Sequence, residues 1–412
     1  MQDAQNGDAI TFDPSVFPPD APETIALSSG LPELNQGNIT IDASDAGVIL
    51  DGSNIASPEP QHGLAIWSDG NIVRGLQITG FSSAGIGIYG QYNIIGGDRS
   101  VGDGPMGQGN LISGNGEFGI GLWNEDTSHN TIQGNYIGIN MDGTATWGHS
   151  RDGIHSNGAA QNLITDNVIG GNGDAGIQLC CVSDGRNVVT GNLIGVGPSG
   201  IPLGNGLAGV LIHSTHHNVV GPGNTIAHNL GAGILFWEDI RNNTVTQNSI
   251  RENGGGGISL TSTIQHTLQP PLIIDFDLQA GTATGATCPN CMVEIFSDSG
   301  DEGSVYEGQV KAEENGAFIF EKGASLAGPS LTSTATDSDG STSEFSPPTQ
   351  GNRQSLSLQI SDALPLLPLQ TKPSDQLADN RIGASFNELH SPDKGLVISA
   401  LDLGLKRLEV QF

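Results

Sequence analysis

The sequence has few basic side chains: 14 Lys and Arg stand against 44 Asp and Glu, a formal net charge of −30. Nucleic acid and anionic membranes are therefore poor partners, because phosphate binding needs clustered Lys and Arg. No stretch is long and apolar enough to span a membrane, which argues against membrane insertion. The N-terminal letters MQDAQNGDAITF lack the basic and apolar regions of a signal peptide, so either a signal has been removed, which we expect, or the protein stays inside the cell.

Cysteine is also scarce, with four residues. Cys180 and Cys181 are adjacent, whereas Cys288 and Cys291 form a CxxC motif with no second CxxC to complete a zinc set. We therefore predict no metal site. The CxxC motif favours a structural disulfide over a redox pair or half of a metal site, and the adjacent pair is either two free thiols or a vicinal disulfide.

An apolar period of three or four residues is absent, and 61 Gly residues disfavour helices. Instead, a Gly followed by Ile, Leu or Val recurs about every two dozen residues, which is typical of a solenoid. These glycines are Gly63, Gly85, Gly119, Gly153, Gly176, Gly209, Gly233 and Gly257. After each one, apolar residues alternate as in a strand. The sequence therefore predicts an all-β parallel β-helix.

Asparagine recurs in two columns of the same repeat. The first holds Asn71, Asn93, Asn130, Asn162, Asn187, Asn218 and Asn243, and the second holds Asn135, Asn167, Asn192, Asn224 and Asn248. Stacked Asn amides can hydrogen-bond along a column, so we expect both columns to be scaffold. With these repeats the chain resembles the right-handed parallel β-helices of the pectate-lyase-like superfamily, over roughly residues 38–265. That resemblance implies a secreted or cell-surface protein, and the superfamily includes polysaccharide lyases, glycoside hydrolases, epimerases and non-catalytic surface proteins.

Composition divides the chain into four parts. We predict an N-terminal cap with the first coils at 1–62, the β-helix at 63–267, a small β-sandwich at 268–349 and a Leu/Pro-rich tail at 350–412. The sandwich region has short alternating strands between Gly, Asp and Asn turns, and it resembles immunoglobulin-like modules of secreted bacterial proteins. Its acidic turns, Asp298 to Glu302 and Asp337 to Asp339, are possible calcium ligands, although solvated turns are the simpler interpretation.

Large outward-facing residues are expected on one lateral face of the solenoid. The position four residues after each repeated Gly holds Trp67, Tyr89, Trp123, Asn157, Cys180, His213, Trp237 and Thr261. Four of these eight are aromatic in a chain with 5% aromatic residues, and exposed aromatic rings suit the apolar faces of sugars. We therefore predict a polysaccharide partner, unless long loops cover these rings as ordinary packing.

One coil, Asp152 to Asn157, departs from the repeat. Ser156 replaces an inward apolar residue, and His155 and Asn157 are expected to face outward. A long loop at 139–151 begins and ends beside this coil. The polar and aromatic candidates predicted around it are Trp123, Glu125, Asp126, Trp147, His149, Arg151, Asp174, Gln178 and Cys180.

Two chemistries compete for this coil. Glycoside hydrolysis, slightly preferred, would pair Asp152 with Glu125 or Asp126 as the two carboxyl groups. Elimination or epimerisation would use Arg151 to neutralise a uronate and His155 or His149 as the base. The chain lacks the Gly-Asp-Asp motif of polygalacturonase-like hydrolases, and no Lys lies between residues 38 and 265. These departures favour a neutral glycan unless calcium bridges the charges, and they leave a non-catalytic binding protein as a third possibility.

Overall fold

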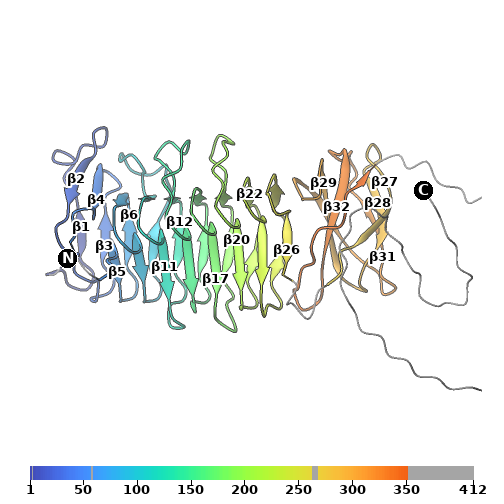
Figure 1. Ribbon diagram of the computed structural model, residues 1–412, viewed down its shortest axis with the longest axis horizontal. Coiled ribbons are helices and arrows are strands. Elements are labelled where there is room, and N and C mark those ends of the chain that lie inside the picture. Colours follow the sequence, from blue (N-terminus) through green and yellow to red (C-terminus); the bar gives the residue numbers. More distant parts are fainter. Residues whose placement is uncertain (2, 57–58, 262–267, 351–412) are drawn as a thin grey trace, which may run out of the picture. The chain divides into compact units, whose positions relative to one another are not determined.

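The computed structural model describes residues 1–350, apart from residues 2, 57–58 and 262–267. Its described elements are all strands, which confirms the all-β prediction (Figure 1). Within the described residues no helix is long and apolar enough to cross a membrane. The predicted tail lies outside the described residues except for its first residue.

Three parallel sheets form the solenoid. Sheet A contains β1 (Ala9–Thr11), β3 (Thr40–Asp42), β6 (Ile72–Arg74), β9 (Ile94–Gly96), β12 (Thr131–Gln133), β15 (Leu163–Thr165), β18 (Val188–Thr190), β21 (Val219–Val220) and β24 (Thr244–Val245). Sheet B contains β2 (Glu23–Ala26), β4 (Val48–Asp51), β7 (Leu76–Thr79), β10 (Leu111–Ile112), β13 (Tyr136–Ile137), β16 (Val168–Ile169), β19 (Leu193–Ile194), β22 (Thr225–Ala227) and β25 (Ser249–Arg251). Sheet C contains β5 (Leu64–Ile66), β8 (Ile86–Ile88), β11 (Ile120–Trp123), β14 (Ile154–Asn157), β17 (Ile177–Cys180), β20 (Val210–His213), β23 (Ile234–Trp237) and β26 (Ile258–Leu260).

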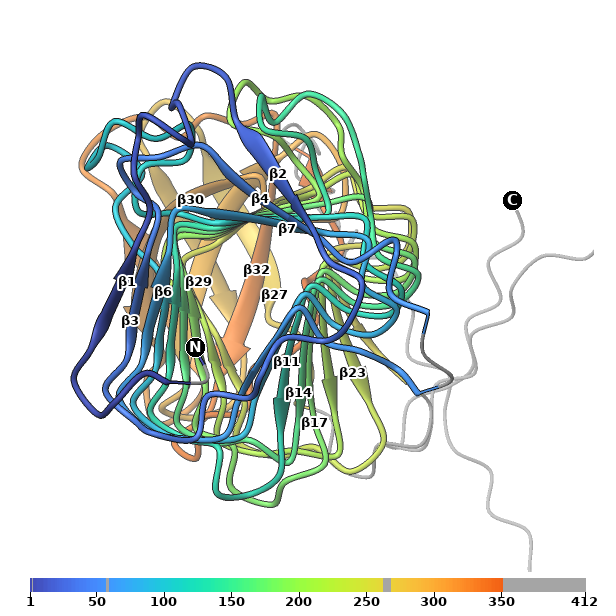
Figure 2. The ribbon, with the colours of Figure 1, turned by 90° about the vertical axis from the view of Figure 1, so that its left-hand side faces the viewer.

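The coil is right-handed. Viewed from the N-terminal side in Figure 2, the chain passes clockwise from sheet A to sheet B to sheet C while receding from the viewer. Each coil places one strand in each sheet, and each strand pairs with its counterparts in the neighbouring coils. This confirms the predicted right-handed parallel β-helix.

The Gly-Ile repeat forms sheet C. Its strands pair in the predicted register, with Ile120 opposite Ile86 and Ile154, and so on along the sheet. The inward residues of these strands, such as Ile120 and Leu122, have no exposed surface and belong to one continuous apolar core. Burial of such side chains contributes about 1.5–3 kcal/mol each, so hydrophobic burial is the main force that closes the coils.

Both predicted Asn columns are hydrogen-bonded ladders. In the first, every Asn from Asn71 donates its backbone N–H and its side-chain amide to the Oδ1 of the next coil's Asn, ending at Asn243. The second follows the same rule from Asn110 to Asn248, so it begins one coil earlier than predicted. Because buried amides are costly without partners, these ladders fix the register of the corners.

A third ladder, which the sequence analysis missed, lies at the corner between sheets B and C. Its rungs stand four residues before each repeated Gly and are Asn115, His149, Asn172, Asn205, Asn229 and Asn253. His149 takes the place of an Asn: its Nδ1 accepts the Asn115 N–H at 3.1 Å, and Nε2 contacts the Ile112 carbonyl oxygen at 3.1 Å. Burial lowers the pKa of His149 to about 4, so this ring is neutral and structural.

Two long loops leave the solenoid at the corner between sheets B and C. The loops at 139–151 and 196–207 each begin with a short antiparallel bridge, Ile139 to Thr146 and Val196 to Pro202. They follow sheet B strands and precede sheet C strands, and Ile139 and Leu203 share a small apolar cluster. The loop at 98–108 lies instead between sheets A and B. The loop at 98–108 therefore lies away from sheet C, whereas the other two insertions border the edge at which the sheet C strands begin.

Two antiparallel sheets with a shared apolar core follow the solenoid. One contains β27 (Leu272–Asp277), β28 (Thr282–Ala286) and β31 (Ala317–Glu321). The other contains β30 (Val305–Lys311), β29 (Met292–Asp298), β32 (Ser330–Thr336) and β33 (Thr349–Gln350). This confirms the small β-sandwich, whereas its immunoglobulin-like nature stays a prediction. Asp298 and Asp337 accept backbone N–H groups of their own turns, and calcium binding there is also untested.

Three glutamates of the sandwich meet the last coil. Glu302 accepts hydrogen bonds from the backbone and side chain of Asn253, the final rung of the third ladder. Glu294 accepts from Thr246 and from the Gln247 N–H, and Glu344 accepts from the Leu260 N–H. The sandwich thus supplies hydrogen-bond acceptors to the donors of the last coil. In the earlier coils, the following coil supplies these acceptors.

The buried position of Glu294 predicts a pH-dependent stability. Burial raises its pKa above the ordinary value of 4.5 despite its hydrogen bonds, so the folded chain holds a proton that the unfolded chain has released. The stabilising effect of Glu294 on the free energy of unfolding is fully present below the ordinary pKa of 4.5, and it is lost as the pH rises through the raised pKa of the folded chain. Urea unfolding of Glu294→Gln should show a smaller fall in stability from pH 5 to pH 8 than the parent chain.

The control is Glu23→Gln, because Glu23 is exposed on β2. An equal flattening of the pH profile in Glu23→Gln and Glu294→Gln would mean that general charge repulsion, and not the burial of Glu294, causes the fall.

Candidate functional site

The outward positions of sheet C form one row across the coils. Trp123, Asn157, Cys180, His213 and Trp237 are direct neighbours in the strand register, as predicted. Neighbouring strands lie about 4.8 Å apart, so this row is an almost continuous track of side chains. Trp237 is 42% exposed, and Asn157 is exposed as well.

An aromatic pair stands at the N-terminal end of this row. The rings of Trp67 and Tyr89 are stacked, with centroids 3.8 Å apart and planes within 2° of parallel. The Tyr89 hydroxyl lies 3.1 Å from His62 Nε2, which holds the tyrosine ring in place. Trp67 is 48% exposed, so one wide aromatic surface is open to solvent here.

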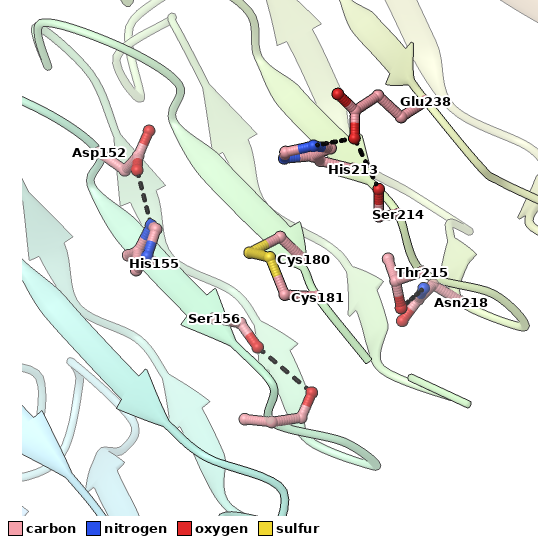
Figure 3. Close-up of a disulfide and its surroundings, with 11 residues drawn as sticks. Asp152, His155, Ser156, Cys180, Cys181, His213, Ser214, Thr215, Asn218 and Glu238 are labelled. Carbon is pink, nitrogen blue, oxygen red and sulfur yellow. Dashed lines mark hydrogen bonds and ion pairs between the residues drawn. A yellow bond between two sulfur atoms is a disulfide. The ribbon is translucent and has the colours of Figure 1, made fainter. Parts of the chain in front are cut away.

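At the centre of the face a buried carboxylate holds an imidazole. Asp152 has no exposed surface, and its Oδ2 lies 2.9 Å from His155 Nδ1 (Figure 3). The other carboxylate oxygen, Oδ1, accepts the Ala175 N–H at 2.9 Å. An ionised Asp152 therefore selects the His155 tautomer or cation with a proton on Nδ1. No described residue hydrogen-bonds to His155 Nε2, which leaves that nitrogen for a ligand.

Aromatic rings surround His155. Phe118 stacks on it at 4.4 Å between centroids, and Trp123 lies 5.2 Å away at 48°. Trp123 folds back over Gly121, where a Cβ atom would lie 2.5 Å from the indole ring, so only glycine leaves room. His155 is consequently 6% exposed, and the Arg151 guanidinium lies 5.1 Å from the Phe118 ring centre.

Arg151 is a half-exposed cation beside this cluster. Its Nε lies 3.6 Å from Asp174 Oδ2, with about half of each side chain exposed. An exposed pair at this distance contributes little stability and is easily exchanged for another anion. Gln178, half-buried, lies next to His155 in the strand register. The predicted residues that the structure brings around His155 are thus Asp152, Trp123, Gln178 and Arg151.

The predicted carboxyl pair does not form. Asp152 precedes β14, whereas Glu125 and Asp126 are exposed beyond the far end of β11, and a four-residue strand spans roughly 13 Å. Both oxygens of Asp152 are also committed inside the protein. Asp152 is therefore a buried partner of His155, and it is not placed to act directly on a glycosidic bond.

Two further candidates change their role. His149 is 3% exposed and is a rung of the third Asn ladder, so it is available neither as a base nor as a substrate contact. Trp147 is 60% exposed, but it belongs to the loop at the corner of sheets B and C. Among the described residues no ring contact joins Trp147 to the His155 cluster.

The sequence analysis also missed the importance of Phe118 and the burial of Asp152. Both occupy the position just before a repeated Gly, where the next coils have Ala175, Ala208 and Ala232. A carboxylate in a column of small apolar residues indicates a buried acid that needs a partner, and His155 lies three residues later. Comparing this column across coils would have found the pair.

Both cysteine pairs are disulfides, which confirms the expectation for the CxxC motif and decides between the two alternatives left open for the adjacent pair. Cys288 bonds to Cys291, and Cys180 bonds to its neighbour Cys181 on the sheet C face. His213 lies beside Cys180 in the next strand, and its Nε2 is 3.0 Å from Glu238 Oε2. His213 therefore faces a sulfur pair on one side and a carboxylate on the other.

Comparison with known proteins adds a family match within the solenoid. Residues 138–256 match the family described as "Periplasmic copper-binding protein (NosD)". No curated protein sequence matches the chain. The matched region contains His155, both adjacent cysteines and His213.

Solved structures with related folds are distant. A pectate lyase has a TM-score of 0.40 and 16% identity, over 65% of this chain and 72% of its own. A periplasmic alginate epimerase has a TM-score of 0.40 and 15% identity, over 63% of this chain and 59% of its own. The enzymatically active domain of bacteriophage CBA120 tailspike protein 2 has a TM-score of 0.35 and 10% identity, over 84% and 72%. These values say nothing about what this chain binds.

Proposed function

We propose that this chain is a secreted or cell-surface, polysaccharide-active enzyme that binds an extended glycan along the outward face of sheet C and removes a proton from it with His155. The observation that carries the proposal is the Asp152–His155 pair, a fully buried carboxylate bonded at 2.9 Å to an imidazole on that face. In the other coils of sheet C that the structure describes, no such pair occurs.

The pair has the arrangement that a general base needs. With Nδ1–H donated to Asp152, neutral His155 carries its lone pair on Nε2, and the buried carboxylate stabilises the imidazolium that forms when a proton is taken. Asp152 acts only through His155. This assignment replaces hydrolysis by a carboxyl pair, because the structure separates Asp152 from Glu125 and Asp126.

A uronate is a suitable substrate for proton removal, because the C–H group next to its carboxylate is acidic. We assign the role of neutralising that carboxylate to Arg151, which lies beside the cluster and is only weakly paired with Asp174. The reaction class is therefore elimination or epimerisation. A chain with a formal net charge of −30 repels a polyanion, so added calcium should favour binding.

A binding protein without catalysis is the second candidate. It is favoured by the coverage of His155, which Phe118 and Trp123 leave 6% exposed. Under this second hypothesis, Trp123 stays over Gly121 beside His155 and keeps a substrate away from the imidazole.

The test is incubation of the full chain with neutral and uronate polysaccharides, with and without calcium. Unsaturated products absorb in the ultraviolet, epimerisation is followed by exchange of the ring proton for deuterium, and hydrolysis gives reducing ends alone. Unsaturation or deuterium exchange supports the proposal. Reducing ends alone overturn it, and binding without any product supports the second candidate.

The stacked pair should contribute to glycan affinity. Trp67→Ala removes the exposed ring of the pair and should weaken glycan binding by roughly five- to tenfold, since aromatic contacts of this kind contribute about 1 kcal/mol. Affinity electrophoresis in gels that contain the bound polysaccharide measures the change. Trp147→Ala is the matched control, because Trp147 is exposed on a loop away from the row; equal losses in the two variants would contradict a sheet C binding face.

A further inference from the structure

A second cluster on sheet C has the composition of a metal site. One sulfur each from Cys180 and Cys181 and one ring nitrogen of His213 lie within 4.8 Å of one another (Figure 3). The strand register causes this, because Cys180 and His213 are direct neighbours on β17 and β20. The proposed proton removal does not use these three side chains, although Cys180 and His213 belong to the row along which the glycan would bind.

We propose that reduction of the Cys180–Cys181 disulfide creates a redox-controlled site for a thiophilic d10 cation, with both sulfurs and His213 as ligands. A dithiol reductant supplies the two electrons and two protons: the S–S bond breaks, two thiols form, and the reductant becomes a disulfide. Binding of the cation then releases both thiol protons, since thiolates are the ligands. While the disulfide is intact, the site is closed.

The donor set favours such a cation. Two thiolates and an imidazole match Zn(II) or Cu(I), and three protein ligands leave one position open for water or another ligand. His213 Nε2 is 3.0 Å from Glu238 Oε2, which leaves Nδ1 as the ring nitrogen without a hydrogen-bond partner among the described residues. A carboxylate on the second ring nitrogen is the usual means of orienting a metal-bound histidine.

The carboxylate is itself held in place. Glu238 Oε2 also accepts the Ser214 hydroxyl at 3.1 Å. This second hydrogen bond fixes the carboxylate oxygen that orients the His213 ring.

The disulfide is accessible from one side. Cys181 is exposed whereas Cys180 is 3% exposed, so an attacking thiolate reaches the Cys181 sulfur and Cys180 is the leaving group. Cys181 has a left-handed backbone conformation, with φ 70°, so the chain turns directly after Cys180, the last residue of β17.

The experiment uses the full chain with Cys288→Ser and Cys291→Ser, so that the vicinal pair holds the only cysteines. After reduction with a dithiol and its removal, the protein is titrated with Cd(II), and the thiolate-to-metal absorption is followed. We expect one Cd(II) per reduced chain and at least 100-fold weaker binding by the oxidised chain. Zn(II) should displace the Cd(II).

Two variants separate a three-ligand site from a simple dithiol. His213→Ala should weaken Cd(II) binding at least tenfold, and Glu238→Gln should weaken it roughly tenfold through the orientation of His213. His129→Ala, exposed and stacked on Tyr92, is the control and should bind as the parent does. Unchanged binding in both variants, or no binding by the reduced parent, overturns the proposal. Glu238→Gln keeps the test decisive if His213→Ala fails to fold.

Discussion

Asn192→Asp should lower the free energy of unfolding by about 3–5 kcal/mol, the cost of an uncompensated buried charge. Asn192 is fully buried in the second ladder. Its side-chain amide donates to three oxygens, the carbonyls of Ile164 and Thr190 and Oδ1 of Asn224, at 2.9–3.0 Å. Aspartate would place a carboxylate oxygen against all three acceptors. Urea unfolding at pH 7 measures the loss.

Asn35→Asp is the matched control, because Asn35 is exposed and lies outside the ladders. It should change stability by less than about 0.5 kcal/mol. The ladder variant should also recover part of its stability as the pH falls and the carboxyl group becomes protonated. A loss below about 1 kcal/mol at pH 7 would mean that water enters the corner and replaces the ladder bonds.

His155→Ala should lower kcat by about 10²- to 10⁴-fold on any glycan that the chain turns over, with a smaller change in KM. The reason is that His155 Nε2 would take the proton, whereas much of the binding comes from the rest of the face. Initial rates across a range of glycan concentrations separate the two constants. His129→Ala, on an exposed histidine, should leave both unchanged.

Asp152→Asn tests how the base is oriented. Its Oδ1 can still accept the Ala175 N–H, so its amide group would donate to His155 Nδ1 and force the ring proton onto Nε2. Nε2 would then lack the lone pair that takes a proton. We expect a lower kcat, an unchanged KM and a shifted pH profile of kcat/KM. Full activity in both Asp152→Asn and His155→Ala would move the chemistry elsewhere on the chain.

The fold was accessible from the sequence because each coil repeats the same physical requirements. The Gly-Ile step and the two Asn columns recur in nearly every coil, so the register of sheet C and the ladders at two corners were confirmed. The third ladder was missed because its column is interrupted by His149. Histidine and asparagine can both accept a backbone N–H at this position, but a search for repeated Asn residues does not find the histidine.

The site was less accessible, because burial depends on neighbours from other coils. Asp152 before a Gly looks like a turn residue, and only the stacked coil containing Ala175 shows that it is enclosed. Trp123 was expected to point away from the sheet. It instead lies over Gly121, where the absence of a side chain leaves room for the indole ring. No local sequence pattern predicts that a neighbouring ring will fill this room.

The Asn ladders give the solenoid a net dipole along its axis. Every rung donates toward the next coil, so the amide dipoles of each column add up as peptide dipoles do in a helix. The C-terminal ends of the columns are then partially positive, and carboxylates complement them. Glu302 accepts from Asn253, the last rung of the third column, and a basic side chain in its place would be repelled. A solenoid built on such columns can be lengthened by whole coils, but the sign of its two ends stays the same.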